Sequence, residues 1–317
     1  MGAVSFGDRR RSCYAHVVSS LAGPRRPVLG AVVLVLAAVC WGLGFYAQRV
    51  SITELSALWA TALRFLVAVP CVVGVLWWRW RRGVVVPWAV GGLLGVLLYV
   101  AFALQTVAMQ HTPVSRVALL TGLYGVVTPL LQPAFGLGWP SRLQWVAALL
   151  AVVGTVLLCG IVGDTAAFSA PANIGDLMTL GMAVVGAVVV LIVARVAHET
   201  DPIALNAVQI VAMAVCGVVV AVVVEPEGVA RVGAIGAATV WSLLYLALFS
   251  TIVAFTLQFI GQQHLSAAPA AIIMLLEVPI GVLSAVLLLG EAMAGLQWLG
   301  AAVAVVAVVV AVIGERR

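Results

Sequence analysis

Two ionisable residues lie inside long apolar stretches of the sequence, where charge is costly. Glu277 lies well inside the stretch 267–289, which ends far beyond it. A carboxylate surrounded by hydrocarbon costs several kcal/mol unless it is paired, wetted by a cavity or protonated. Glu277 therefore has two interpretations. It binds a substrate amine or carries a coupling proton, or it is a structural acid that bonds a neighbouring helix or the backbone freed by Pro279.

Arg64 is the matching base, inside the stretch 56–78. Its guanidinium could bind a substrate carboxylate, pair with Glu277, or tie helices together through backbone carbonyls. A comparison of the two halves of the chain places Gln209 at the equivalent point. An uncharged residue there favours the structural interpretation of Arg64.

Several aromatic and hydroxyl residues lie in the apolar stretches and are candidates for the wall of a binding cavity. Rings can stack on a ligand and hydroxyls can orient it. These candidates are Trp41, Tyr99, Thr121 and Tyr124. We find no His/Cys cluster with metal-ligand spacing and no GxxxxGK[ST] loop. The sequence therefore predicts no catalytic residue, no metal, no cofactor and no ATP hydrolysis by this chain.

Two prolines and two glutamines occupy similar places in the two halves. Pro129 and Pro279 each remove a helical hydrogen bond, which produces either a static kink or a flexing point for a gate. Gln105 and Gln258 stand near the ends of two apolar stretches. Their placement suits gates, and it suits helix-end hydrogen bonding at least as well.

The elements that hold these residues must be membrane helices. The chain is 64% hydrophobic and only 9% charged, with a mean hydropathy of +1.22. A water-exposed surface needs about 25% charged residues. Stretches of roughly 20 apolar residues, the length that crosses a bilayer as a helix, fall at these places: 28–47, 56–78, 87–109, 114–135, 142–161, 175–195, 203–224, 236–260, 267–289 and 294–313. We therefore expect an all-α integral membrane protein with ten transmembrane helices.

The basic residues predict the orientation of these helices. All 16 are arginine, and the net charge of +5 comes from short segments between apolar stretches, which does not indicate nucleic-acid binding. With the N-terminus inside, twelve arginines are cytoplasmic, while Arg49, Arg116 and Arg231 lie outside and Arg64 is embedded. This bias follows the positive-inside rule. It predicts a protein of the cell (inner or plasma) membrane with both termini in the cytoplasm. Trp77, Trp78, Trp80 and Trp88 are expected in an interfacial belt beside Arg79–Arg82.

The sequence repeats weakly at a separation of 153 residues. Leu104–His111 returns as Leu257–His264, and Leu143-Gln144-Trp145 returns as Leu296-Gln297-Trp298. Each half holds five predicted helices, and an odd number forces the second half into the membrane with inverted topology. Inverted repeats are typical of secondary transporters, which bind substrate where the repeats meet.

The predicted organisation has five parts. Residues 1–27 form a disordered cytoplasmic tail, since they are polar and lack the apolar centre of a signal peptide. The two five-helix repeats occupy 28–161 and 174–313, an extracytoplasmic linker occupies 162–173, and 314–317 form the cytoplasmic C-terminus. Small residues such as Gly295 and Ala302 in the last helix are compatible with a packing face or a homodimer face.

The order of several short motifs resembles the drug/metabolite transporter superfamily, and more narrowly its EamA-type members. The motifs are Trp41-Gly42, Ala62-Leu63-Arg64-Phe65, Leu119–Tyr124 with Thr128-Pro129-Leu130, and Leu275–Pro279 followed by Leu287–Glu291. The resemblance covers roughly 28–313. It implies two five-helix repeats around a central cavity, and export or exchange of small metabolites, often amino acids or related compounds.

The sequence thus favours a secondary carrier whose repeats expose a cavity alternately to each side of the bilayer. Its partners would be a small-molecule substrate, the lipid bilayer, and a coupled proton or counter-substrate. The alternative is a membrane-embedded enzyme or a non-transporting scaffold. Enzymes in lipid usually show clustered acids, His or Ser near one interface, whereas only Glu277 and Arg64 lie deep here.

Overall fold

The computed structural model describes residues 26–112, 114–158, 173–281, 283 and 295–315. Every regular element within these residues is helical. The expectations for most of the N-terminal tail, for 162–172 of the linker, for Leu287–Glu291 and for the last two residues lie outside the described residues.

The helices of the first half are α2 (Pro27–Glu54), α3 (Ala57–Arg81), α4 (Trp88–Ala108), α5 (Val114–Thr121), α6 (Tyr124–Leu131), the 3₁₀-helix η1 (Gln132–Phe135) and α7 (Arg142–Leu158). The helices of the second half are α9 (Ile174–Val196), α10 (Pro202–Val224), η2 (Pro226–Gly228), α11 (Val229–Val232), α12 (Ala237–Tyr245), the π-helix η3 (Leu246–Val253), α13 (Ala254–Gln262), α14 (Ala267–Met274) and α16 (Gly295–Glu315).

Seven helices in the described part of the chain are long and apolar enough to cross a membrane. They begin at Pro27, Ala57, Trp88, Ile174, Pro202, Ala237 and Gly295. Three further apolar helices, Leu119–Phe135, Arg142–Leu157 and Ala267–Gly281, are shorter. These three fall at the fourth, fifth and ninth predicted spans. The structure therefore confirms an all-helical membrane protein, and the count of ten spans stays a prediction.

The helices at the fourth and ninth predicted spans are interrupted in the same way. Gly122 and Leu123 form a turn between α5 and α6, and Leu275 and Leu276 form a turn directly after α14. The two turns are 153 residues apart, as are the ends of α5 and α14 that precede them. The repeat that is faint in the residue types is thus also present in the helix boundaries.

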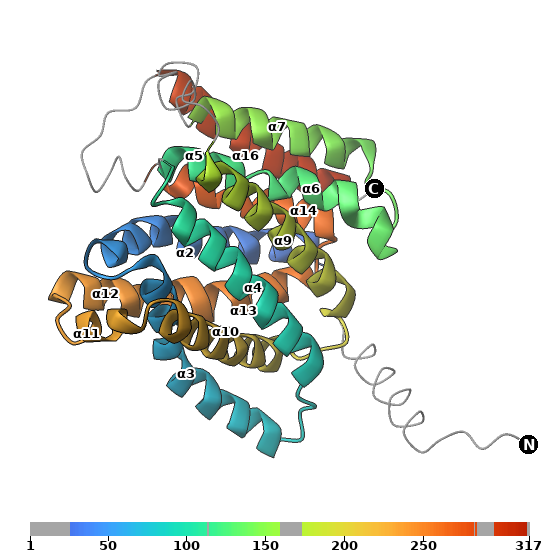
Figure 1. Ribbon diagram of the computed structural model, residues 1–317. Coiled ribbons are helices and arrows are strands. Elements are labelled where there is room, and N and C mark those ends of the chain that lie inside the picture. Colours follow the sequence, from blue (N-terminus) through green and yellow to red (C-terminus); the bar gives the residue numbers. More distant parts are fainter. Residues whose placement is uncertain (1–25, 113, 159–172, 282, 284–294, 316–317) are drawn as a thin grey trace, which may run out of the picture.

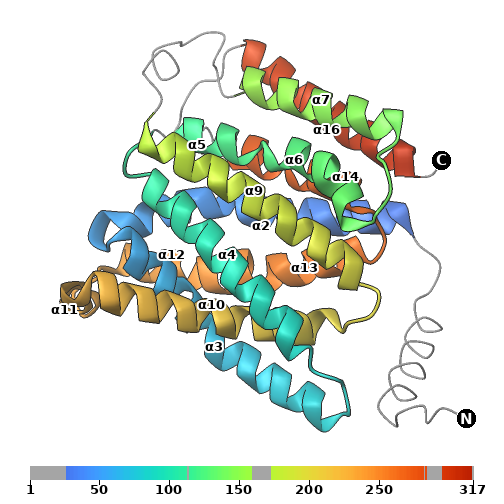
Figure 2. The same cartoon turned by 45° about the vertical axis from the view of Figure 1, so that its right-hand side comes forward.

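Helices of the two halves pack against each other in pairs. α7 lies along α16, α3 along α10, α4 along α9, and α2 along α13. In Figures 1 and 2, α7 and α16 lie side by side at one edge, and α3 lies at the opposite edge beside α10. The α3–α10 pair is antiparallel, because Ser56 bonds Glu225 at one end and Arg79 pairs with Asp201 at the other, at 2.9 Å.

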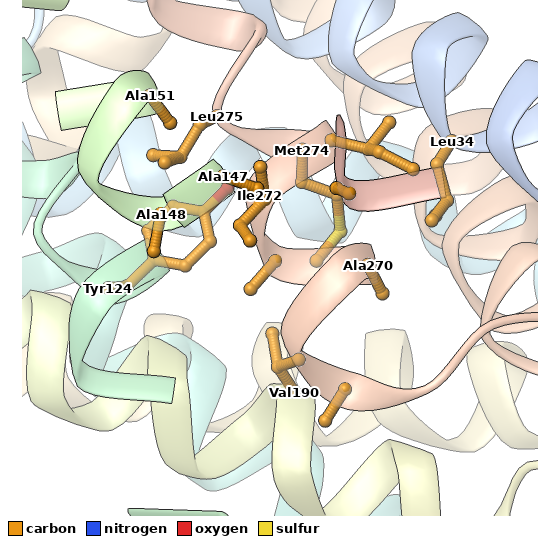
Figure 3. Close-up of a cluster of buried hydrophobic side chains, with 14 of the residues drawn as sticks. Leu34, Tyr124, Ala147, Ala148, Ala151, Val190, Ala270, Ile272, Met274 and Leu275 are labelled. Atoms are coloured by element: carbon orange, nitrogen blue, oxygen red, sulfur yellow. The ribbon is translucent and has the colours of Figure 1, made fainter. Parts of the chain in front are cut away.

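α14 lies inside the molecule. All eight of its residues are buried, and an evenly apolar helix of this kind has no face for solvent or lipid. Figure 3 shows its surroundings: Leu34, Tyr124, Val190 and the alanines of α7 meet side chains of α14 such as Ile272. Small alanines on α7 let the helices approach closely. The chain that follows α14, including Glu277, is thereby held in the interior.

Candidate functional site

A cavity of about 80 Å³ lies between helices of both halves. Its walls come from α2, α3, α4 and α6 of the first half, and from α9, η3, α13, α14 and the chain after α14 of the second. Six of the predicted site residues line it: Trp41, Arg64, Gln105, Tyr124, Gln258 and Glu277. A concave, mostly apolar space with a few converging polar groups is the usual form of a small-molecule site.

Glu277 lies at the restart of the helix after the Leu275–Leu276 turn, and its side chain lines the cavity. Within the described residues, its carboxylate has no hydrogen-bond or ion-pair partner. The structural interpretation required such a partner, either on a neighbouring helix or on backbone near Pro279. An acid without a partner in this surrounding is stabilised by a proton, by water or by a cationic group that enters the cavity.

Tyr124 is the counterpart of Glu277 in the first half. The two residues are 153 positions apart, and each restarts a helix after a two-residue turn. The Tyr124 ring packs beside Ala148 and Leu275 in Figure 3, and the residue also lines the cavity. One half therefore supplies a phenol and the other a carboxylate from equivalent positions. The 153-residue repeat already relates Tyr124 to Glu277, but the sequence analysis did not pair these two residues.

Arg64 is tied to the π-helix η3. Its Nε donates to the Thr251 hydroxyl at 3.0 Å, and its Nη2 donates to the Ser250 hydroxyl at 2.9 Å and the Ser250 carbonyl at 3.3 Å. The guanidinium also lies over the Phe102 ring, 4.4 Å from its centroid. It forms no ion pair with Glu277, so that alternative is not realised here. Arg64 instead bonds α3 to η3 at the edge of the cavity, and a role in binding substrate stays a prediction.

Trp41 is fixed by the same segment. Its indole N–H donates to the Ser250 carbonyl at 2.9 Å, and its ring meets Phe255 edge-on at 5.3 Å between centroids. Asn206 of α10 donates to the Ile252 carbonyl, also at 2.9 Å. Side chains of α2, α3 and α10 thus converge on one short π-helix. Such segments are rare and occur often at functional sites. No signal in the sequence pointed to this one.

The two glutamines hold their places through local bonds. Gln105 donates to the Thr121 hydroxyl at 3.3 Å, and Gln258 donates to Gln262 at 3.1 Å. Both also line the cavity. Thr121 is fully buried behind Gln105 and is not among the lining residues. Gln48, which donates to Thr106 at 2.6 Å, lines the cavity and was missed because a lone glutamine near a helix end gives no signal.

Tyr99 and the prolines lie apart from the lining. The Tyr99 ring is buried with Phe65 and Leu94, and its hydroxyl has no partner among the described residues. Pro129 is buried in α6, and Pro279 is buried in the turn of helix after Glu277. Both follow a turn that already interrupts the helix, so they add to an existing break. A gating role for them stays a prediction.

Comparison with known proteins identifies the family. Residues 28–160 and 173–313 each match the EamA-like transporter family. The chain belongs to this family. Membership of this family implies that the protein is a transporter, and the match of both halves implies that they are related to each other. Both points agree with the resemblance drawn from the sequence motifs.

Individual relatives of this EamA-like chain are distant. A protein of Archaeoglobus fulgidus named as an uncharacterized transporter is 24% identical over 281 residues, which cover 87% of this chain and 83% of the relative. A protein of known crystal structure superposes with a TM-score of 0.73 at 19% identity, covering 89% of this chain and 97% of the other. The second likeness supports the fold alone.

Proposed function

We propose that this chain is a secondary transporter that moves small metabolites by alternating access through the cavity between its halves. Ten helices cross the cell membrane as two inverted five-helix repeats, with both termini in the cytoplasm. The EamA-like family, the 153-residue spacing of helix boundaries and the pairing of helices across the halves support this reading. Membership of a transporter family also argues against an enzyme.

The observation that carries the proposal is the composition of the cavity wall. Each half contributes a residue at the equivalent helix break, Tyr124 from one and Glu277 from the other. A movement of one half against the other therefore changes the surroundings of both groups at once. A fixed binding pocket or a scaffold has no need for such a construction, whereas alternating access depends on it.

The substrate class follows from the charges in the wall. Glu277 attracts a cationic group, such as an ammonium, and the guanidinium of Arg64 borders the same space. Trp41, Phe45 and Phe102 supply apolar area between them. Amino-acid-like compounds, exchanged against protons or a counter-substrate, fit this arrangement. Metabolite profiling of medium and cytoplasm, with and without overexpression of the chain, would provide the substrate for the test below.

Glu277→Gln tests the proposal in proteoliposomes. Glutamine keeps the size of the side chain and cannot exchange a proton. We expect substrate uptake driven by a pH gradient to be lost in this variant, while exchange of labelled against unlabelled substrate persists in part. The measurement is initial uptake of labelled substrate with and without an imposed gradient.

Glu227→Gln is the control, because this acid is exposed in η2, far along the chain from the cavity lining. It should leave both kinds of flux unchanged. Gradient-driven uptake that survives Glu277→Gln would remove the carboxylate from the coupling. A wild-type protein that moves no solute in either assay would contradict the transporter itself.

A further inference from the structure

An apolar groove lies along α3, separate from the central cavity. It has a volume of about 340 Å³ and lies between α3, α10 and the segment from η3 to α13. Its two polar residues already satisfy each other, since Asn206 donates to the Thr256 hydroxyl at 2.8 Å. The other lining residues are apolar or nearly so, and they include Cys71, Val75, Ile203, Ala207, Val253 and Leu257. The groove is therefore suited to hydrocarbon.

The groove leads toward the arginine-rich end of α3. Cys71, Val75, Arg79 and Arg82 follow one another at four, four and three residues, which places them along one stripe of the helix. With about 1.5 Å of rise per residue, Arg79 lies about 6 Å beyond Val75. Arg79 also reaches across to Asp201 of α10, at 2.9 Å, so the ion pair marks the end of the groove.

Of the three arginines at this end, Arg79 pairs with Asp201, whereas the charges of Arg81 and Arg82 are not neutralised within the described chain. Arg81 and Arg82 are exposed, and neither pairs with a described carboxylate. Their guanidinium groups lie over the rings of Trp77 and Trp78, at 3.9 and 3.8 Å from the ring centroids. The Nε of Arg79 is buried and has no hydrogen-bond partner among the described residues. The exposed guanidinium groups of Arg81 and Arg82 are thus the donors that this end of the groove offers to an anion.

Exposed tryptophans locate this end at the surface of the bilayer. Trp77, Trp78, Trp80 and Trp88 are each between 46% and 63% exposed. Large amphipathic rings of this kind gather at the level of the lipid headgroups. α3 lies at the edge of the molecule in both Figure 1 and Figure 2. The groove is consequently open to lipid, with its arginines at headgroup depth.

We propose that the groove is a binding site for an anionic phospholipid. One acyl chain lies between α3, α10 and α13, and the phosphate accepts hydrogen bonds from the exposed guanidinium of Arg82. Guanidinium groups bind phosphate with strong charge-assisted hydrogen bonds. A zwitterionic headgroup gains less there, because its own cation offsets the phosphate. This site is independent of the transport proposed for the central cavity.

Native mass spectrometry of the delipidated full-length protein tests the site. The probes are palmitoyl-oleoyl-phosphatidylglycerol, palmitoyl-oleoyl-phosphatidylcholine with the same chains, and glycerol phosphate, which has the headgroup charge without chains. We expect phosphatidylglycerol to bind more tightly than phosphatidylcholine. Glycerol phosphate should not bind measurably at the same concentrations.

Two pairs of variants locate the lipid. Arg82→Gln should weaken phosphatidylglycerol binding roughly five-fold, the equivalent of about 1 kcal/mol per arginine near a membrane surface. Its neighbour Arg81 is off the groove's stripe, so Arg81→Gln should weaken binding less. Cys71→Trp fills the groove and should weaken binding of both lipids. Val73→Trp, on exposed surface outside the groove lining, should not.

Arg82→Lys keeps the charge and should retain the preference for phosphatidylglycerol, even where Arg82→Gln fails to fold. Equal binding of the two lipids to wild-type protein would overturn the proposal. It would also be overturned by equal effects of Arg82→Gln and Arg81→Gln, or of Cys71→Trp and Val73→Trp. Tight binding of glycerol phosphate alone would replace the lipid with a simple anion.

Discussion

At the scale of single residues, the polar side chains of the cavity wall differ in how they are held. Trp41 and Arg64 are both bonded to Ser250 of the π-helix. Glu277 has no partner among the described residues. A buried charge is tolerated when several hydrogen bonds satisfy it, and it is costly when they are removed. The stability of the protein should therefore depend on Arg64, and the coupling of transport on Glu277.

Arg64→Lys tests the fixed part of the wall. A lysine keeps the charge but lacks the planar fork that reaches Ser250 and Thr251 together. We expect the free energy of unfolding to fall by about 2–4 kcal/mol, since hydrogen bonds of a charged donor contribute about 1.5–3 kcal/mol each. Thermal unfolding in detergent is the measurement, with Arg49→Lys at an exposed position as control. An unchanged melting temperature with weaker substrate binding would make Arg64 a ligand instead.

At the scale of elements, the helices around the cavity meet by different means at its two ends. Arg116 of α5 pairs with Asp176 of α9 at 2.6 Å, and Asp176 also belongs to the capping box that starts α9. At the other end, α2 packs on α13 without room for a side chain at Gly261, where a Cβ atom would lie 2.5 Å from Leu34. A rocking movement of the halves that separates α5 from α9 must break an ion pair. Separation of α2 from α13 parts only apolar surfaces.

Asp176→Asn tests this difference between the ends. It removes the negative partner of Arg116 and keeps an amide that can still cap α9. We expect a cysteine placed at Phe45 in the cavity to react faster with a membrane-impermeant maleimide, in a background without native cysteines. Asp201→Asn is the control, because Asp201 also caps a helix and pairs with an arginine. If both variants accelerate the maleimide reaction equally, the protein is loosened as a whole, and the α5–α9 contact has no specific role in closing the cavity.

At the scale of the whole molecule, the halves are held together by contacts between them. α7 and α16 have the most extensive contact of any helix pair, and each comes from a different half. The pair approaches closely at Gly154, where a Cβ atom would lie 2.7 Å from the backbone nitrogen of Ala304 and 2.9 Å from the Gly300 carbonyl. Small residues at such a crossing let helix backbones touch in a membrane.

Gly154→Leu should therefore separate α7 from α16. The contact is made with backbone, which cannot move aside as a flexible side chain can, so we expect a loss of about 1–3 kcal/mol or more in the free energy of unfolding. Thermal unfolding in detergent measures it. Gly92→Leu is the control, because no atom lies within 4 Å of a Cβ at Gly92. A similar melting temperature for both variants would contradict close packing at Gly154.

The sequence alone determined the membrane character, the helical class, the two related halves and six of the residues that line the cavity. Composition and apolar length decide the first two, since lipid leaves few other ways to satisfy a backbone. A deep acid such as Glu277 stands out in the sequence because burying its charge is costly wherever its helix packs. Glu277 was chosen on this ground, whereas Trp41 and Tyr124 were chosen because aromatic rings can stack on a ligand.

Only the tertiary structure decided which side chains face one another. Tyr99 and Thr121 have suitable chemistry, yet they lie outside the lining because helix rotation turns them into the packing. Arg64 bonds Ser250, 186 residues away, and the π-helix that receives it gives no pattern in the sequence. Residue types set the cost of burial. Which side chains contact one another depends on how ten apolar segments of similar composition pack. The shapes of the assembled helices decide that packing.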